Sequence, residues 1–363
     1  MVIDTNPPQE VHMNATGHVF VSGYTQAPYG EGPGVVRFSL AADGTVGQRQ
    51  AEGGGSVNPS FVTPGGGSLL AVEELPHGRI TALDPETLEV RGRAPSGGAD
   101  PCHLMLVGAD VWAANYSSGT ASVTPLAGLL ESTTAPPPVL LSHPGSGPVS
   151  GRQAGSHAHQ VTATPWGTVL VSDLGADRVD EYSARTQVRL GSAELPPGTG
   201  PRHVAIKGVF LLVSGELDGY VHVLRRAEVA PGAGAGHFWK WLFRTPLART
   251  AEEVAGAKDF APSHIQLSGD GTKLYGAVRG PNTLVVLDVR GLDGAAPTPP
   301  AVLAQVPSGG SWPRHFALGE NKIFVANQYS DSVAVFELDG DGLPGAAPVQ
   351  TLAFGSPTCV VLA

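Results

Sequence analysis

Titratable side chains recur along this chain at a regular interval. Six times an apolar stretch opens on a His or Phe, and a second stretch ends on a polar residue twelve to fifteen positions later. The six pairs are Phe61 with Glu73, His103 with Asn115, His159 with Asp173, His203 with Glu216, His264 with Arg279, and His315 with Asn327. Arg202, Glu216 and Arg279 stand out because the equivalent positions elsewhere hold other residue types.

These residue types together suit the binding and hydrolysis of a small anionic molecule. An Arg guanidinium presents a planar fork of donors to a carboxylate, a phosphate or a developing oxyanion. His and Glu can move protons near neutral pH. Further candidates for ligand contacts are His157, beside His159, and Arg314, in a Pro-Arg-His run that repeats the one at Arg202. Taken singly, His203, His264 and His315 could equally be structural residues that recur because the unit recurs.

The repeated unit predicts where these side chains lie. Two consecutive strands joined by a short turn run antiparallel, so the first strand begins where the second one ends. If the units are arranged radially, all the paired residues face one end of the molecule. A period of forty to sixty residues indicates a propeller or another repeat architecture. High Gly and Pro, 49 and 32 residues, fits many short strands and turns.

We therefore predict an all-β fold, a seven-bladed β-propeller that forms a single domain over residues 1–363. Two segments interrupt the repeat and are expected to be inserted loops, near residues 126–156 and 225–261. The tail from Pro357 to Ala363 reads as a strand without a partner in its own unit, and the first unit is one strand short. Pairing the C-terminal strand with the first blade would leave no open edge there.

Composition and motifs exclude several classes of function. A net charge of -10 and a pI near 5.6 disfavour nucleic acid as a partner. Cys102 and Cys359 stand far apart, so no zinc site is expected. Gly-x-Ser-x-Gly, His-Glu-x-x-His and phosphate-loop motifs are absent from the sequence. Without a signal sequence or an apolar stretch of about 18 residues, we expect no membrane partner and a cytoplasmic location.

The ordered motifs from about Gly17 to Ala363 resemble the seven-bladed propeller lactonases, which include 6-phosphogluconolactonases and muconate cycloisomerases. The resemblance rests on Asn58-Pro-Ser-Phe, Arg152-Gln153, His157-Ala-His159, Gly-Pro-Arg202-His203 followed by Glu216, Arg279, and Trp-Pro-Arg314 followed by Asn327. It implies a catalytic set of His159, Arg202, Glu216 and Arg279. It also implies hydrolysis of a sugar lactone, most simply 6-phosphogluconolactone, with no cofactor and no metal.

The expected mechanism has Glu216 or His159 as the general base that activates water. Arg202 and Arg279 would stabilise the oxyanion or hold the anionic group of the substrate, and the substrate-binding residues would be His157, His203, His264, Arg314 and His315. The expected partner is a small anionic lactone, and the protein is expected to be a monomer or weak homodimer. Two alternatives stay open: a muconate-type lactonizing cycloisomerase, and a non-catalytic propeller that binds a protein or glycan.

Overall fold

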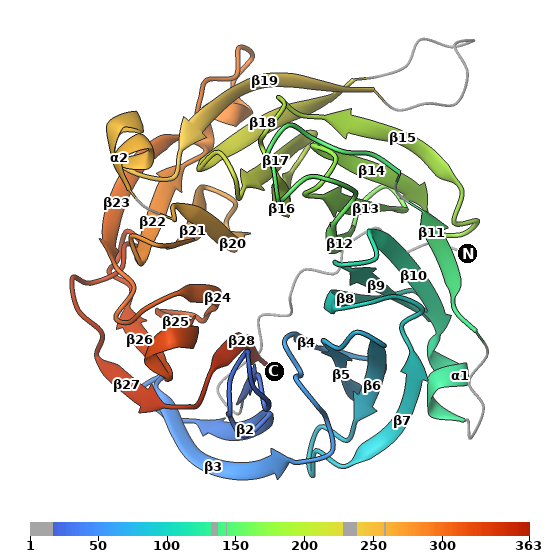
Figure 1. Ribbon diagram of the computed structural model, residues 1–363. Coiled ribbons are helices and arrows are strands. Elements are labelled where there is room, and N and C mark those ends of the chain that lie inside the picture. The colour runs from blue at the N-terminus through green and yellow to red at the C-terminus, as the bar shows by residue number, and fades with distance from the viewer. Residues whose placement is uncertain (1–16, 132–136, 143, 228–237, 258) are drawn as a thin grey trace, which may run out of the picture.

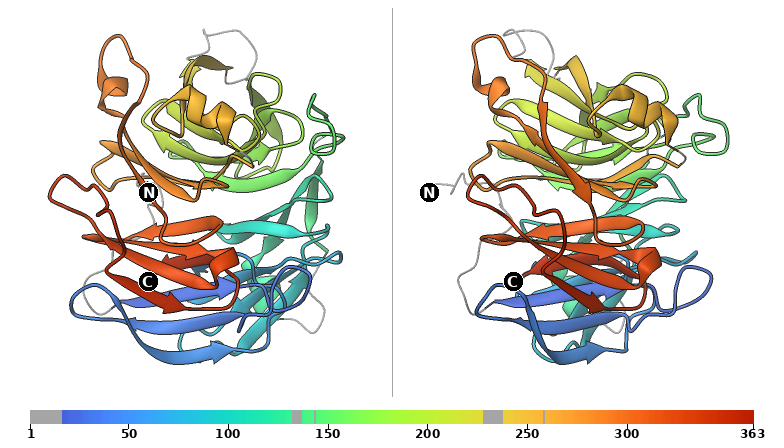
Figure 2. Two further views of the ribbon diagram at one scale, coloured as in Figure 1. Left: turned by 60° about the vertical axis from the view of Figure 1, so that its left-hand side comes forward. Right: turned by 90° about the vertical axis from the view of Figure 1, so that its left-hand side faces the viewer.

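Seven four-stranded antiparallel sheets surround a central axis in the computed structural model, which describes residues 17–131, 137–142, 144–227, 238–257 and 259–363 (Figure 1). Each sheet is one blade, and one of its two edge strands lies next to the axis. Seen from the side, neighbouring sheets lie face to face (Figure 2). The predicted seven-bladed, all-β fold is confirmed.

Blades are numbered along the chain, and their strands are given from the axis outward. Blade 1 contains β28 (Pro357–Leu362), β1 (His18–Gly23), β2 (Val35–Leu40) and β3 (Val46–Gly53); blade 2 contains β4 (Val62–Gly65), β5 (Ser68–Glu73), β6 (Arg79–Leu83) and β7 (Val90–Pro95); blade 3 contains β8 (Pro101–Val107), β9 (Asp110–Asn115), β10 (Thr120–Pro125) and β11 (Val139–Ser142); blade 4 contains β12 (Ala158–Ala163), β13 (Thr168–Asp173), β14 (Arg178–Ser183) and β15 (Arg189–Glu194). Blade 5 contains β16 (Pro201–Lys207), β17 (Phe210–Gly215), β18 (Tyr220–Ala227) and β19 (Phe238–Pro246); blade 6 contains β20 (Ala261–Leu267), β21 (Lys273–Arg279), β22 (Thr283–Asp288) and β23 (Ala301–Pro307); blade 7 contains β24 (Pro313–Leu318), β25 (Lys322–Asn327), β26 (Ser332–Glu337) and β27 (Gln350–Ala353).

Within the described ranges, four short helices lie in the connections between strands. They are α1 (Leu126–Leu130), α2 (Ala251–Gly256) and the 3-10 helices η1 (Arg290–Asp293) and η2 (Gln328–Ser330). The two segments expected as inserted loops each hold the outer strand of a blade, β11 in 126–156 and β19 in 225–261. Residues 132–136, 143, 228–237 and 258 of these segments lie outside the described residues.

The hydrophobic core lies between adjacent blades. One cluster joins Val221 and Val223 of blade 5 to Leu274 and Val285 of blade 6. The second strands β5, β13, β17 and β25 are buried along their whole length because another blade packs on each face. Outer strands such as β15 are mostly half-buried or exposed. Burying a Val or Leu side chain contributes about 1.5–3 kcal/mol, so these interfaces fix the positions of the inner strands.

Strand β28 closes the ring as predicted. It pairs antiparallel with β1, with Phe20 opposite Val361 and Val21 opposite Val360. The first blade therefore takes its innermost strand from the end of the chain, and its other three strands from the beginning.

Candidate active site at the channel mouth

Most inner strands begin with the same backbone structure at one end of the channel. In five blades the residue before the opening proline has a positive φ: Asn58, Asp100, Gly200, Trp312 and Ser356. The carbonyl group of this residue accepts a hydrogen bond from the amide just beyond the second strand. Non-glycine residues other than Asn and Asp seldom adopt this left-handed conformation, so Trp312, with φ 65°, is strained.

These backbone hydrogen bonds hold a ring of side chains at the mouth. The amides that donate to the five carbonyls belong to Glu74, Tyr116, Glu216, Gln328 and Tyr24, in the same order. Two of the five residues are carboxylates, Glu74 of blade 2 and Glu216 of blade 5. The sequence pairs had instead aligned Glu73 with Glu216, but Glu73 is the last residue of β5 and Glu216 follows β17.

A second ring consists of the residues that directly follow the opening proline of each inner strand, or Ala158 in blade 4, which lacks this proline. They are Ser60, Cys102, His159, Arg202, Ser263, Arg314 and Thr358. In five blades the pairing with the second strand shifts here, which marks a β-bulge. Bulges are common beside active sites, where they redirect a side chain. His159, Arg202 and Arg314 thus occupy equivalent positions.

This register corrects the alignment of blade 4. The sequence pairs group His159 with the recurring histidines, but Gln160 holds their position. Gln160 lies opposite Ser172 in blade 4, just as His103 lies opposite Ala114 in blade 3. The side-chain oxygen of Gln160 accepts a hydrogen bond from the amide of Val204 at 2.6 Å. His159 therefore belongs with the arginines of the second ring.

The recurring aromatic residues form a closed ring of neighbouring side chains around the axis. Ring centroids are 4.2 Å apart for Phe61 and His103, 5.7 Å for His103 and His203, 5.1 Å for His203 and His264, 4.0 Å for His264 and His315, and 5.5 Å for His315 and Phe61. Nδ1 of His203 lies 2.9 Å from Nδ1 of His264, so one of the two nitrogens donates and the other accepts. Burial holds the pKa of all four histidines well below its usual value. They are neutral at pH 7.

Glu216 stands at the centre of a cluster of three guanidinium groups. Its Oε2 lies 3.0 Å from Nε of Arg202 and accepts a hydrogen bond from Nη2 of Arg279 at 2.6 Å. Its Oε1 accepts one from Nη2 of Arg152 at 2.5 Å. Burial alone would raise the pKa of Glu216, but Arg279 and Arg202 outweigh it and hold that pKa far below its ordinary range. Glu216 is therefore ionised, and both its oxygens are engaged.

Arg202 has a donor without an acceptor. Its side chain is 4% exposed, and among the described atoms its Nη1 has no hydrogen-bond partner. Burial, followed by repulsion from Arg279, lowers the pKa of Arg202 to about 9, against attraction from Glu216. The cluster of Arg152, Arg202, Arg279 and Glu216 therefore carries an excess of positive charge, and an anion would relieve it.

His159 lies beside this cluster. Its ring centroid is 5.5 Å from that of His203 and 5.6 Å from that of Tyr116, and its Nδ1 is 3.9 Å from Sγ of Cys102. Burial and then Arg202 hold the pKa of His159 well below its usual value. The imidazole is therefore neutral at pH 7 and can accept a hydrogen bond.

A third group at the mouth consists of Tyr24, Glu74 and Arg314. The Tyr24 hydroxyl donates to Oε2 of Glu74 at 3.0 Å. The guanidinium carbon of Arg314 lies 5.4 Å from the centre of the Tyr24 ring, and its Nη1 donates to Oε1 of Gln328 at 3.3 Å. Sequence reasoning missed Tyr24 and Glu74. The signal was available: Glu74 and Glu216 each stand fifteen residues after a proline, Pro59 and Pro201.

Two further residues lie at the mouth: His157, which was expected there, and Arg152, which was not. His157 stacks on Tyr116, with ring centroids 4.6 Å apart, and its Nδ1 lies 3.0 Å from the carbonyl oxygen of Tyr116. Arg152 comes from the segment expected as an inserted loop and reaches both Glu216 and the hydroxyl of Tyr116. Arg279 also donates to the carbonyl oxygen of Ala261 at 3.2 Å, which fixes its position at the end of β21.

Most of the residues that end the second strands have structural roles. Glu73 is buried and bonds Arg79, Thr81 and Arg93 within its own blade. Asn327 donates to the carbonyl oxygen of Ser308 at 3.0 Å. Arg279 differs from them because it extends to Glu216 of the neighbouring blade.

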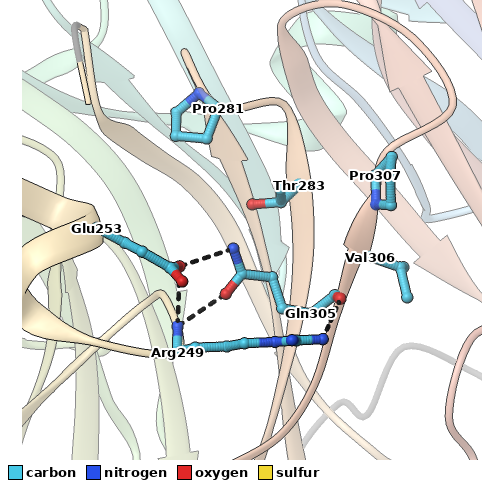
Figure 3. A pocket seen from close by; sticks show the side chains of 7 residues that line it. All are labelled: Arg249, Glu253, Pro281, Thr283, Gln305, Val306 and Pro307. Carbon is cyan, nitrogen blue, oxygen red and sulfur yellow. Dashed lines mark hydrogen bonds between the residues drawn. The ribbon is translucent and has the colours of Figure 1, made fainter. Parts of the chain in front are cut away.

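A surface pocket lies farther from the axis, between the α2 region and blade 6 (Figure 3). Its polar groups bond one another: Gln305 donates to Glu253 at 3.1 Å and accepts from the amide of Arg249 at 2.7 Å. These groups are already paired, so the pocket offers less to a ligand than the mouth does. Among the described residues, no group of three or more His, Cys, Asp or Glu side chains is placed to hold a metal ion. No helix in the described ranges is long and apolar enough to cross a membrane.

Comparison with known proteins agrees with this geometry. The family model described as lactonase, 7-bladed beta-propeller, matches residues 18–362. The chain is 30% identical over 294 residues to a 6-phosphogluconolactonase of Bacillus subtilis, and the aligned region covers 78% of this chain and 76% of that protein. It is 26% identical over 351 residues to a 6-phosphogluconolactonase of Formosa agariphila, with 88% and 92% covered. The solved periplasmic gluconolactonase of Pseudomonas aeruginosa superimposes with a TM-score of 0.80 at 27% identity, covering 96% and 99% of the two chains.

The buried cluster of Arg, Glu and His side chains at one channel mouth combines residue types that can bind an anion and move protons. The family match makes the class of protein definite, because it spans almost the whole described chain. This protein belongs to the seven-bladed β-propeller lactonase family and is a lactone-hydrolysing enzyme.

Proposed function

We propose that this protein hydrolyses a sugar lactone at the channel mouth, with 6-phosphogluconolactone as substrate and 6-phosphogluconate as product. The observation that carries the proposal is the buried Nη1 of Arg202, which lacks an acceptor among the described atoms in a cluster with excess positive charge. A lactone carbonyl oxygen, negatively charged in the tetrahedral intermediate, is an acceptor of the kind this donor requires. The relatives named as 6-phosphogluconolactonases support the choice of substrate.

Arg202 and Arg279 stabilise the oxyanion in this mechanism, and Glu216 holds the two guanidinium groups in place. Prearranged donors in a site without bulk water stabilise developing charge more strongly than water does. Arg314, on the blade 7 side of the mouth, is placed to bind the distal anionic group of the substrate, while His157 lies at the rim. His203, His264 and His315 form the floor beneath the substrate.

The general base was expected to be Glu216 or His159. Three guanidinium groups and a very low pKa make Glu216 a weak proton acceptor, so we assign it to positioning. The neutral His159 can accept a hydrogen bond from the attacking water and orient it, although its depressed pKa makes it a weak base as well. Neither of the two expected residues therefore suits the role of base well.

The proposal is tested by following proton release from 6-phosphogluconolactone, gluconolactone and muconolactone, corrected for spontaneous hydrolysis. We expect the phosphorylated lactone to give the highest kcat/KM. Arg202→Ala and Glu216→Gln should each lower kcat on the order of a hundredfold or more, because each disturbs the oxyanion donors. Arg290→Ala serves as the control, since Arg290 is exposed at the start of η1 and pairs with the nearby Asp288.

Absence of hydrolysis of all three lactones would overturn the proposal and favour a propeller that binds a ligand without catalysis. Preference for muconolactone would favour the cycloisomerase alternative. We also propose a cytoplasmic location and a monomer or weak homodimer, which cell fractionation and sedimentation would test. The periplasmic location of the Pseudomonas relative makes fractionation informative.

A further inference from the structure

We propose that Glu74 is the carboxylate that moves the proton during catalysis, while Glu216 stays ionised. The inference rests on the proposed lactone hydrolysis. It begins with the repeat. Just beyond the second strand, one backbone amide donates a hydrogen bond to the carbonyl group of the residue before the opening proline, and among the described residues only Glu74 and Glu216 place a carboxylate there. Glu74 and Glu216 thus share a backbone environment and differ in the charges around them.

The surroundings of Glu74 leave it available to a ligand. Its Oε2 accepts a hydrogen bond from the Tyr24 hydroxyl, whereas Glu216 receives three guanidinium groups. The other groups that act on the charge of Glu74 are Arg314 of β24, the Ser60 hydroxyl before β4 and Asp100 before β8. Glu74 is also partly exposed, while Glu216 is buried.

The electrostatics of the two carboxylates differ in direction. Partial burial raises the pKa of Glu74 above its ordinary 4.5, and the opposing effects of Arg314, Ser60 and Tyr24 are smaller. The arginines depress the pKa of Glu216. Pairs of titratable groups whose surroundings push their pKa values apart mark acid and base roles in enzymes. A carboxylate with a raised pKa accepts a proton more readily at neutral pH than one with a depressed pKa.

Both carboxylates act on the same space. At the second-ring position of blade 3, burial raises the pKa of the Cys102 thiol, Glu74 and Glu216 raise it further, and Arg202 and Arg314 oppose them. Strands β5 and β17, which lead into Glu74 and Glu216, come from blades on facing sides of the axis (Figure 1). A lactone lying between them would have the arginine cluster on one side and Glu74 on the other.

The reaction then balances with a single carboxyl group. Ionised Glu74 takes a proton from water as the water oxygen bonds to the lactone carbonyl carbon, and the carbonyl oxygen becomes the oxyanion held by Arg202 and Arg279. When the intermediate collapses, the bond between that carbon and the ring oxygen breaks. Protonated Glu74 then donates its proton to the departing ring oxygen, and the new carboxylic acid releases its own proton to solution.

The test is the pH dependence of kcat/KM for wild type, Glu74→Gln, Glu74→Asp and Tyr24→Phe with 6-phosphogluconolactone. We expect Glu74→Gln to lower kcat about a hundredfold or more with little change in KM, and Glu74→Asp to restore part of the loss. Tyr24→Phe should move the acidic limb to higher pH, because the hydrogen bond from Tyr24 lowers the pKa of Glu74.

Glu73→Gln is the matched control, because Glu73 is the adjacent carboxylate and bonds only within its blade. It should lower the melting temperature and leave the acidic limb in place. A second readout is independent of turnover: infrared titration, with Glu74→Gln as the difference reference, should show Glu74 titrating above 4.5.

The outcomes separate this inference from the proposed function. Wild-type turnover together with a Glu74→Gln variant that keeps its kcat and its acidic limb would overturn the role of Glu74 alone. Titration of Glu74 at or below 4.5 would contradict it too. Absence of turnover by the wild type on every lactone would overturn the proposed function, and the role of Glu74 with it.

Discussion

Single residues at the mouth differ in how far the sequence reveals them. Arg202, Glu216 and Arg279 could be recognised because each breaks the residue type expected from the repeat. Glu74 was overlooked in favour of its neighbour Glu73, although Glu74 stands as far from Pro59 as Glu216 stands from Pro201. Arg152 belongs to a stretch without repeat pattern, where position along the chain says nothing about position in space.

Arg152 gives a prediction at this scale. Arg152→Ala should lower kcat/KM for 6-phosphogluconolactone by roughly fivefold, the equivalent of about 1 kcal/mol for a partly exposed ion pair. The side chain of Arg152 is 42% exposed, so salt should screen its contribution. The measurement compares kcat/KM of wild type and variant at low and high ionic strength. A loss as large as that of Arg202→Ala, insensitive to salt, would contradict this assignment.

At the scale of the element, the inner strands of blades 3, 5 and 7 begin with a left-handed residue, a bulge and a histidine in succession. The strands themselves were predictable from their apolar runs and turn residues. The bulge was not, and it caused His159 to be aligned one position out of register, because blade 4 lacks the opening proline and carries two histidines in His157-Ala158-His159. A one-residue shift of this kind changes which side chains share a layer.

The ring of aromatic side chains around the axis should make the stability of the fold depend on pH. Burial lowers the pKa of His103 and His315 to about 3, whereas an unfolded His titrates near about 6.5. The unfolded chain therefore binds protons that the folded one does not, and stability is lost as pH falls from about 6.5 toward 3. His103→Gln, which gives blade 3 the residue type that Gln160 supplies in blade 4, should make this fall less steep. Urea unfolding at several pH values measures it.

The pH dependence of the unfolding free energy tests whether His103 takes up a proton when the chain unfolds. Equal slopes of unfolding free energy against pH in wild type and His103→Gln would show that His103 takes up no proton on unfolding. Val188→Ala is a control outside the ring, because Val188 is exposed at the surface and does not titrate. Its slope in this pH range should stay close to that of wild type.

For the whole molecule, the number of blades and their closure could be predicted because the repeat runs almost end to end. The outer strands β11 and β19 could not, since they lie within segments whose spacing departs from the repeat. Outer strands have one face toward solvent and tolerate polar residues, so their apolar pattern is weak. The mouth is also a property of the whole molecule, because its cluster draws Arg202 and Glu216 from blade 5 and Arg279 from blade 6.

Ring closure provides the last prediction. Deleting Gly355 to Ala363 removes β28, and with it Cys359 and Val360, which are fully buried in the clusters between blade 1 and its neighbours. Burial of a Val side chain contributes about 1.5–3 kcal/mol, and β1 would also lose its ladder partner. We expect a much lower melting temperature, partly restored by adding the missing segment as a peptide. An unchanged melting temperature would show that the other blades stand without closure. A low melting temperature that the peptide does not raise would mean that the covalent link to β27 is itself needed to seat the strand.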